Sequence, residues 1–302
     1  MKKLLALTLA FLFGFMLVGC NADNEPLTII APNGAPALSQ IFLQADTEKY
    51  TVDVVNGEDP LIAALGSGSH DFVFCATNAG AKLYQSGVDY TFVAAITFGN
   101  LFLVSSEANF TIDSLEGKEI ILFGQNATPD IVLKYILDEN NINATLSYVD
   151  SVASANAMYI SDNTKIIMTA EPLMSVLSLN VGDFSIIDLQ QEYKDITGKD
   201  SYPQAGVFAK NTLTSRQINR FLSDLEDSVA LVNGDIDATV AKAAELGYTF
   251  PEAVLRSAIP NSNIGYKSAE DVRADLEYYF NIILGMNGTL IGDVLPDDDF
   301  YY

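Results

Sequence analysis

The sequence is short of the side chains that most often bind metals and acidic polymers. Its 302 residues include one histidine, two cysteines and no tryptophan, and 16 Lys and Arg stand against 39 Asp and Glu. So few imidazole and thiolate ligands exclude a multi-histidine or cysteine-rich metal centre. A formal net charge of −23 argues against nucleic-acid binding, which needs clustered basic residues, and against an electrostatic membrane-binding face.

The chain does have enough apolar side chains for a core. Hydrophobic residues make up 49% of it and charged residues 18%, which is typical of a folded protein and excludes global disorder. A chain of this length forms either one large domain or two lobes.

The N-terminus has the layout of an export signal. Lys2 and Lys3 precede an apolar run, Leu4–Val18, which is too short for a comfortable transmembrane span. Residues 17–20, with the sequence Leu-Val-Gly-Cys, match a lipobox, which ends at the cysteine to be acylated. The alternative is an ordinary signal peptide whose apolar run happens to end in cysteine.

We therefore expect residues 1–19 to be a lipoprotein signal peptide and residues 20–26 to be a short leash, attached to lipid through Cys20. This places the protein on the extracytoplasmic face of a bacterial cell membrane, as a palmitate-carrying lipoprotein. Cys75 then has no disulfide partner, so the core alone must hold the exported domain together.

Strand-like and helix-like segments alternate along the mature chain, which predicts an α/β fold. From Thr214 onward the chain is mostly helical, with amphipathic stretches at Ile218–Val232 and Ala269–Leu284 among others. The expected strands are residues 27–31, 50–55, 71–76, 92–96, 101–105, 119–123, 146–149, 165–169, 185–189 and 206–210.

The motifs of common enzyme classes are missing. His70 is the lone histidine and would have to be the base of any Ser-His-acid triad, yet no Gly-x-Ser-x-Gly elbow is present. There is no Walker A loop, so any ATP hydrolysis would belong to a partner subunit. Cys75 ends an apolar strand and is better explained as a packed core residue than as a nucleophile.

Several strands end in small or polar turns that lead into helices, and these turns recur in both halves of the chain. They are residues 33–35, 76–78, 124–128 and 170–172. Ligands of open α/β sheets bind outside the carboxyl ends of the strands, where helix N–H groups and polar side chains form a rim. Helix capping explains each single turn equally well.

The order and spacing of four phrases carry a family resemblance. They are residues 71–80, residues 97–101, residues 115–118 with 123–125, and residues 170–172. Together with the lipobox they resemble the type II periplasmic-binding lipoproteins of ABC importers, in the branch for nitrate, sulfonate, taurine and the thiamine-pyrimidine precursor. The resemblance spans roughly Leu27–Leu246.

The resemblance implies two α/β lobes, each a mixed sheet flanked by helices, joined by two hinge crossings. One lobe would hold residues 27–105 and 207–302, and the other residues 106–206. The lobes would trap one solute and deliver it to a membrane permease that works with an ATPase subunit. The chain itself would be a binding protein without catalytic residues, cofactor or metal.

The turns and the family phrases together define a candidate ligand site. The turns contain no Lys or Arg, and Glu171 is their only charge, so we expect a neutral or weakly charged organic solute, such as a planar heterocycle stacked on Phe98 or Tyr202. Sulfonate or another oxyanion remains the alternative, because helix N-termini bind anions without Arg. The candidate residues are Asn33, Gly34, Ala76, Thr77, Asn78, Phe98, Asn100, Gln125, Asn126, Thr128, Glu171 and Tyr202.

Two other functions stay open at this point. One is an enzyme on the same fold that acts on a pyrimidine or a related small molecule. The other is a surface sensor or adhesin that uses the fold without transport. Glu171 has a structural alternative too, since a Glu in a first helical turn complements the helix dipole.

Overall fold

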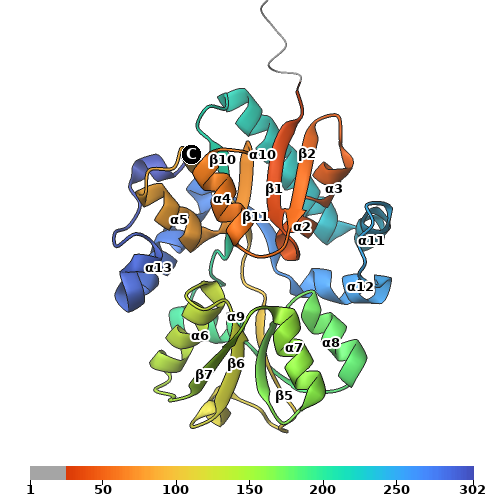
Figure 1. Cartoon of the computed structure of the whole chain (residues 1–302), viewed down its shortest axis with the longest axis vertical. Coiled ribbons are helices and arrows are strands. Elements are labelled where there is room, and N and C mark those ends of the chain that lie inside the picture. Colours follow the sequence, from red (N-terminus) through yellow and green to blue (C-terminus); the bar gives the residue numbers. More distant parts are fainter. Residues whose placement is uncertain (1–24) are drawn as a thin grey trace, which may run out of the picture.

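The computed structural model describes residues 25–302, so the expected signal peptide, Cys20 and most of the leash lie outside the described residues. Two mixed β-sheets, each flanked by helices, form the cores of two lobes, which lie one above the other in Figure 1. Among the described residues, no helix is long and apolar enough to cross a membrane.

The first lobe is built on a six-stranded sheet with the order β11-β4-β10-β3-β1-β2. Strand β1 pairs in parallel with β2 and β3, whereas β10 runs antiparallel to β3 and β4, and β11 runs antiparallel to β4. The strands are β1 (Leu27–Pro32), β2 (Tyr50–Val55), β3 (Phe72–Ala76), β4 (Tyr90–Thr97), β10 (Ala205–Lys210) and β11 (Ile264–Ser268).

The second lobe is built on a five-stranded sheet with the order β7-β6-β8-β5-β9. Strand β6 pairs in parallel with β7 and β8, and β5 runs antiparallel between β8 and β9. The strands are β5 (Leu101–Ser105), β6 (Glu119–Phe123), β7 (Thr145–Val149), β8 (Ile166–Ala170) and β9 (Ser185–Asp188).

The expected division of the chain differs from the observed sheets at two strands. Ala205 and Gly206 of β10 were expected in the second lobe but pair with β3 and β4 of the first sheet. The expected boundary after residue 105 assigns Leu101–Ser105 to the first lobe, but this strand forms ladders with β8 and β9 of the second sheet. The chain therefore crosses before residue 101, at the Gly99 turn, and not after β5.

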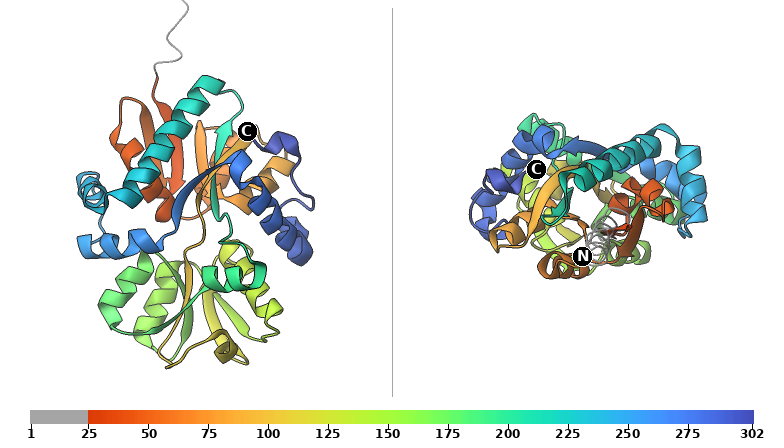
Figure 2. Two further views of the ribbon diagram at one scale, coloured as in Figure 1. Left: turned by 180° about the vertical axis from the view of Figure 1, so that it is seen from behind. Right: turned by 90° about the horizontal axis from the view of Figure 1, so that it is seen from above.

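The helices cover the sheets on both sides (Figures 1 and 2). Around the first sheet lie α2 (Ala35–Ser39), α3 (Ile41–Ala45), α4 (Asp59–Ser67), α5 (Thr77–Gln85), α10 (Ser215–Gly234), α11 (Ile236–Glu245), α12 (Glu252–Asn261) and α13 (Ala269–Asn287). Around the second lie α6 (Thr128–Glu139), α7 (Val152–Ser161), α8 (Leu173–Val181) and α9 (Leu189–Thr197). Short 3₁₀ turns are η1 (Ile112–Leu115), η2 (Gly288–Leu290) and η3 (Asp298–Phe300).

Apolar periodicity explains how α10 docks on the first sheet. Its buried apolar residues recur every three or four positions and form one stripe. Phe221 in this stripe stacks on Phe72 of the fully buried part of β3, with ring centroids 3.6 Å apart. A stripe of this kind predicts the helix well, and the structure confirms the expected Ile218–Val232 helix within α10.

Two elements of the structure were not expected from the sequence. Strand β11 lies within the part of the chain that reads as mostly helical, and only its first residue, Ile264, is buried. Its pairing with β4 is irregular between Ile264 and Lys267. Helix α9 is the second such element, and it follows directly on β9, so its start at Leu189 overlaps the expected strand.

The chain passes between the lobes twice, at residues 98–100 (the first crossing) and residues 198–204 (the second crossing). The crossings are bonded to each other: Ser201 Oγ donates to the Phe98 carbonyl, and Gln204 Nε2 donates to Asn100 Oδ1 at 3.2 Å. Gly99 has a φ of +84°, and a Cβ at this position would lie 2.8 Å from Cζ of Tyr202. The first crossing therefore needs glycine for both its backbone conformation and its packing.

Candidate functional site

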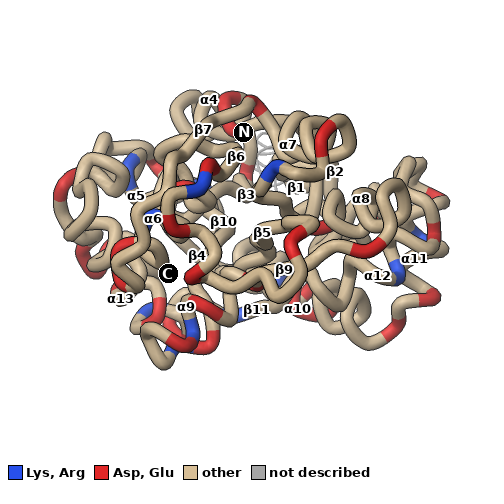
Figure 3. The backbone as a smooth tube through the Cα atoms, turned by 90° about the horizontal axis from the view of Figure 1, so that it is seen from below, with Lys and Arg blue, Asp and Glu red and all other residues tan. Residues whose placement is uncertain are grey.

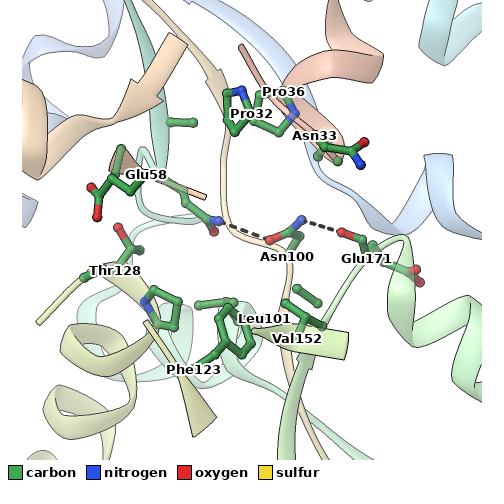
Figure 4. Close-up of a pocket in the computed structure, with 18 of the residues that line it drawn as sticks. Pro32, Asn33, Pro36, Glu58, Asn100, Leu101, Phe123, Thr128, Val152 and Glu171 are labelled. Atoms are coloured by element: carbon green, nitrogen blue, oxygen red, sulfur yellow. Dashed lines mark hydrogen bonds between the residues drawn. The ribbon is translucent and has the colours of Figure 1, made fainter. Parts of the chain in front are cut away.

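A cleft of about 270 Å³ lies between the lobes and is lined by both of them. Figure 4 shows its residues, with the first-lobe groups facing the second-lobe groups across the space. Its lining consists of Pro32, Asn33, Gly34, Ala35, Pro36, Gly57, Glu58, Leu61, Ala76, Asn100, Leu101, Phe123, Ala127, Thr128, Pro129, Val152, Ala170, Glu171, Gln204 and Ala205. Most of these side chains are apolar.

The topology of the two sheets places these residues. Strands β1 and β3 are parallel, as are β6 and β8, and the carboxyl ends of all four strands contribute to the lining. The starts of α4, α6 and α7 add Leu61, Thr128 and Val152. The cleft thus lies where α/β sheets usually bind ligands, outside the carboxyl ends of their strands.

Half of the candidate residues lie together in this lining. They come from the β1–α2 turn, the end of β3, the first crossing, the start of α6 and the end of β8. They are Asn33, Gly34, Ala76, Asn100, Thr128 and Glu171.

Three candidates lie behind the cleft rather than in its lining. Thr77 is fully buried, and its hydroxyl donates to the Pro203 carbonyl at 2.7 Å. Asn78 is 4% exposed and accepts a hydrogen bond from Thr128 Oγ1 at 3.4 Å. Tyr202 is fully buried, and its hydroxyl donates to Gln190 Oε1 at 2.7 Å. These groups support the lining and the crossings.

The other three candidates lie at turns outside the lining. Gln125 and Asn126 are exposed, and Asn126 has a φ of +62° while its N–H donates to Asp130. Phe98 lies beside Lys267, whose Nζ is 5.4 Å from the ring centroid. Neither Phe98 nor Tyr202, the expected stacking partners, lines the cleft, and the aromatic ring that does is Phe123.

Glu58 and Gln204 line the cleft but were not among the candidates. Glu58 stands before Asp59-Pro60, an acidic start with Pro in the first helical turn, which is a recognisable helix beginning. The turn before this helix follows a strand, as the other candidate turns do, so the same criterion could have selected Glu58. Gln204 had no such signal, because it lies at the end of the second crossing.

Asn100 is the polar centre of the cleft floor. It is 5% exposed; its Nδ2 donates to the Glu171 carbonyl at 3.2 Å, and its Oδ1 accepts from Gln204. Figure 4 shows both hydrogen bonds as dashed lines. Within the described residues, Gln204 Oε1 is buried without a partner. Asn100 thus ties both crossings to the end of β8.

The two acidic residues of the lining have different surroundings. Glu171 is 4% exposed, and burial raises the pKa of its carboxyl, although hydrogen bonds from Ser175 N at 3.1 Å and Ser175 Oγ at 3.0 Å oppose this effect. Glu58 is more exposed; desolvation raises its pKa, and Asp59 adds to the effect, whereas Lys82 opposes it.

The residues with enzyme chemistry lie elsewhere. His70 accepts or donates hydrogen bonds with Ser69 Oγ at 2.8 Å and Asp53 Oδ2 at 3.1 Å, at the surface of the first lobe. None of the three lines the cleft. Burial raises the pKa of the Cys75 thiol, so it is not a poised nucleophile. Among residues 25–302, no group of three or more His, Cys, Asp or Glu is placed to hold a metal ion.

Acidic residues outnumber basic ones along the chain, 39 to 16. Figure 3 shows Asp and Glu on helices of both lobes, with Lys and Arg at fewer places. Many of the exposed basic side chains are paired, such as Lys194 with Asp200 and Lys118 with Glu107.

Comparisons by sequence identify no relative: no protein-family model and no curated protein matches the chain. Comparison of structures does find similar proteins. A structure from Parabacteroides distasonis described as an ABC transporter has a TM-score of 0.81 and 20% identity, and the match covers 92% of this chain and 99% of that one. The alkanesulfonate-binding protein from Xanthomonas axonopodis pv. citri, bound to MOPS, has a TM-score of 0.65 and 16% identity, with coverage of 92% and 96%.

A third match names the fold itself. A Candida albicans gene product described as having the generic periplasmic-binding-protein fold has a TM-score of 0.57 and 10% identity, with coverage of 91% and 92%. Identities this low show the fold alone. The expected fold class is thereby confirmed: the chain has the two-lobed periplasmic-binding-protein fold found in the solute-binding proteins of ABC importers.

Proposed function

We propose that the protein is the extracytoplasmic solute-binding component of an ABC importer. The observation that carries this proposal is the cleft, which both lobes line and which lies at the carboxyl ends of the strands of both sheets. In this proposal the cleft traps one small organic solute, and the chain hands it to a membrane permease powered by a separate ATPase subunit.

The lobe division belongs to the same proposal. We place the hinge at the first crossing, residues 98–100, and the second crossing, residues 198–204, so that β5 moves with the second lobe. Contacts between the lobes flank the cleft, where α12 lies against α8 and Thr128 donates to Asn78. Closure of the two lobes around a solute would stabilise such contacts. A ligand that binds the closed state better shifts the equilibrium between open and closed lobes toward the closed state.

Binding fits the cleft better than catalysis. Among the described lining residues there is no His, Cys, Lys or Ser, and the one hydroxyl, that of Thr128, already donates to Asn78. An acyl- or group-transfer enzyme needs a nucleophile next to a base. The apolar lining around a few amide groups is typical of a site that orients a solute.

The size and lining of the cleft limit the solute. A volume of about 270 Å³ is just below the range of about 300–1,000 Å³ usual for drug-sized ligands. We therefore propose a smaller organic molecule with a flat or apolar body, which would stack on Phe123.

We further propose that Cys20 carries lipid and tethers the domain to the outer face of a bacterial membrane. The lipobox at residues 17–20 supports this. Mass spectrometry of the N-terminal peptide tests it: a diacylated Cys20 is expected, and an unmodified Cys20 in membrane-derived protein would contradict it.

A thermal-shift screen of the full-length chain in mild detergent tests the binding function. The panel contains pyrimidines, flavins, thiamine precursors, sulfonates, nitrate and bicarbonate. A solute that binds only the folded state adds about 2.7 kcal/mol of stability at a hundred times its dissociation constant. We expect a saturable rise in melting temperature with one class of solute. Turnover of the bound compound would instead favour an enzyme.

A further inference from the structure

The charges around the cleft restrict the solute beyond its size. Among the described residues, the only charged side chains that line the cleft are Glu58 and Glu171, and no Lys or Arg does. Proteins that bind sulfonate, phosphate or carboxylate usually provide Arg or Lys for it. A bound anion would here add negative charge to a site that holds two carboxyl groups in a chain with a net charge of −23.

Helix N-termini are the other means of binding an anion, and four of those at the cleft are already complemented by groups of the chain itself. The carboxylate of Glu171 accepts from the N–H of Ser175 in the first turn of α8. Asp59 and Asp130 stand in the first turns of α4 and α6, and Ser151 Oγ accepts from Ser154 N at the start of α7. The chain's own acidic and hydroxyl groups therefore complement the starts of α4, α6, α7 and α8. The starts of α2 and α5, next to Gly34 and Ala76 in the lining, have no acidic residue in the first turn and no side-chain cap.

The two carboxyl groups are not equivalent toward a solute. Both oxygens of Glu171 are hydrogen-bonded within its own lobe, to the N–H and hydroxyl of Ser175. Figure 4 shows the Glu171 side chain directed toward α8, whereas Glu58 lies on the opposite side of the cleft, near Thr128. Within the described residues, Glu58 forms no ion pair within 4 Å with any Lys or Arg.

Two amide side chains of the lining, those of Gln204 and Asn33, also have oxygen atoms without a hydrogen-bond donor in the described part of the chain. Gln204 Oε1 is buried and has no hydrogen-bond donor among the described residues, and Asn33 Oδ1 is not engaged by any of them. The Glu58 carboxylate and these two amide oxygens are thus acceptors that no donor of the described chain fills. Acceptors of this kind bind N–H groups.

We infer that the solute is a small nitrogen-containing cation, with an ammonium or amidinium group on Glu58 and an apolar body against Phe123. The inference rests on the proposed function and assigns a substrate class to its cleft. Glu58 is the specificity-determining residue: its charge pairs with the solute, and the amide oxygens accept the remaining N–H groups. A metal ion does not fit as well, because Glu58 is the one carboxylate that is free in the lining of the described chain.

Three probes with one body and different charge test the inference: benzylammonium, benzyl alcohol and benzenesulfonate. Their affinities for the full-length chain in detergent are measured by ligand-observed NMR. We expect benzylammonium to bind at least about tenfold more tightly than benzyl alcohol, which is the effect of one charged hydrogen bond. Benzenesulfonate should bind weakest.

Matched variants connect the preference to one residue. Glu58→Gln should reduce the affinity for benzylammonium to that for benzyl alcohol. Asp59→Asn removes the same charge from the next residue, which does not line the cleft, and should keep the preference. A preference unchanged in Glu58→Gln, or lost equally in Asp59→Asn, would overturn the assignment.

The outcomes separate this inference from the proposed function. Tighter binding of benzenesulfonate, or of any anion of the thermal-shift panel, keeps solute binding and refutes the positive charge. If zinc chloride stabilises the protein and displaces benzylammonium, the inferred ligand would be a metal ion and not an organic cation. If no probe and no panel compound binds, solute binding fails and the inference fails with it.

Discussion

Gly99 offers a sharp test of how the first crossing is built. Its φ of +84° disfavours any side chain, and an added Cβ would meet Gln190 Cγ at 2.7 Å and Tyr202 Cζ at 2.8 Å. Tyr202 is fully buried and bonded to Gln190, so neither can move freely. Gly99→Ala should therefore lower the free energy of unfolding by about 1 kcal/mol for the backbone and by about 1–3 kcal/mol more for overpacking.

Gly198 provides the matched control for the backbone part alone. It has a φ of +70°, and a Cβ there would meet nothing within 4 Å. Urea unfolding, followed by far-UV circular dichroism, gives the free energies for both variants. Gly198→Ala should cost only about 1 kcal/mol. If the two variants lose equal stability, the close packing of the crossing against Tyr202 is wrong.

Three further predictions concern the cleft and its surroundings. Asn100→Ala leaves the Glu171 carbonyl and Gln204 Nε2 without hydrogen-bond partners. It should lower the free energy of unfolding by about 1–3 kcal/mol. A loss smaller than the error of urea unfolding would contradict the role of these hydrogen bonds. Burial raises the pKa of the Glu171 carboxyl. This carboxyl therefore binds a proton more readily in the folded protein than in the unfolded protein. Its contribution to the free energy of unfolding favours the folded state at low pH and is lost as the pH rises through the raised pKa. The stability of the wild type relative to Glu171→Gln should accordingly fall from pH 4.5 upward, and a difference that does not vary with pH refutes this. Ser69→Ala removes the hydroxyl partner of His70, and neither residue lines the cleft. This variant should leave solute affinity unchanged, as measured by calorimetry.

Much of the fold could be predicted because its signals are local. The buried strands, such as Phe72–Ala76, are continuous apolar runs, and the long helices carry apolar stripes, so periodicity identifies both. Strand β11 could not be found in this way, because its Tyr266 and Lys267 remain partly exposed and its place depends on pairing with β4. The lobe boundary was missed for the same reason, since β5 is assigned by its partners and not by its own residues.

The candidate site could be predicted only in part. Residues that directly follow strands, such as Asn33 and Glu171, lie in the cleft because the topology of parallel strands brings their ends together. Tyr202 and Phe98 are also near the crossings, but whether a ring faces the cleft or the core depends on long-range packing. Tyr202 is enclosed by Tyr193 and Tyr279, with ring centroids 5.2 and 5.8 Å away, and no local pattern shows this.

The central claim is that a solute binds between the lobes, and blocking the cleft tests it most directly. Ala127 lines the cleft at the start of α6, and Ala127→Trp would fill the space from the second lobe. Ala253 is exposed on α12, so Ala253→Trp is the control. The measurement is a calorimetric titration with whichever solute stabilises the wild type. The account predicts one solute per chain, bound by the wild type and by Ala253→Trp but at least a hundredfold more weakly by folded Ala127→Trp; equal binding by all three would show that the solute binds elsewhere.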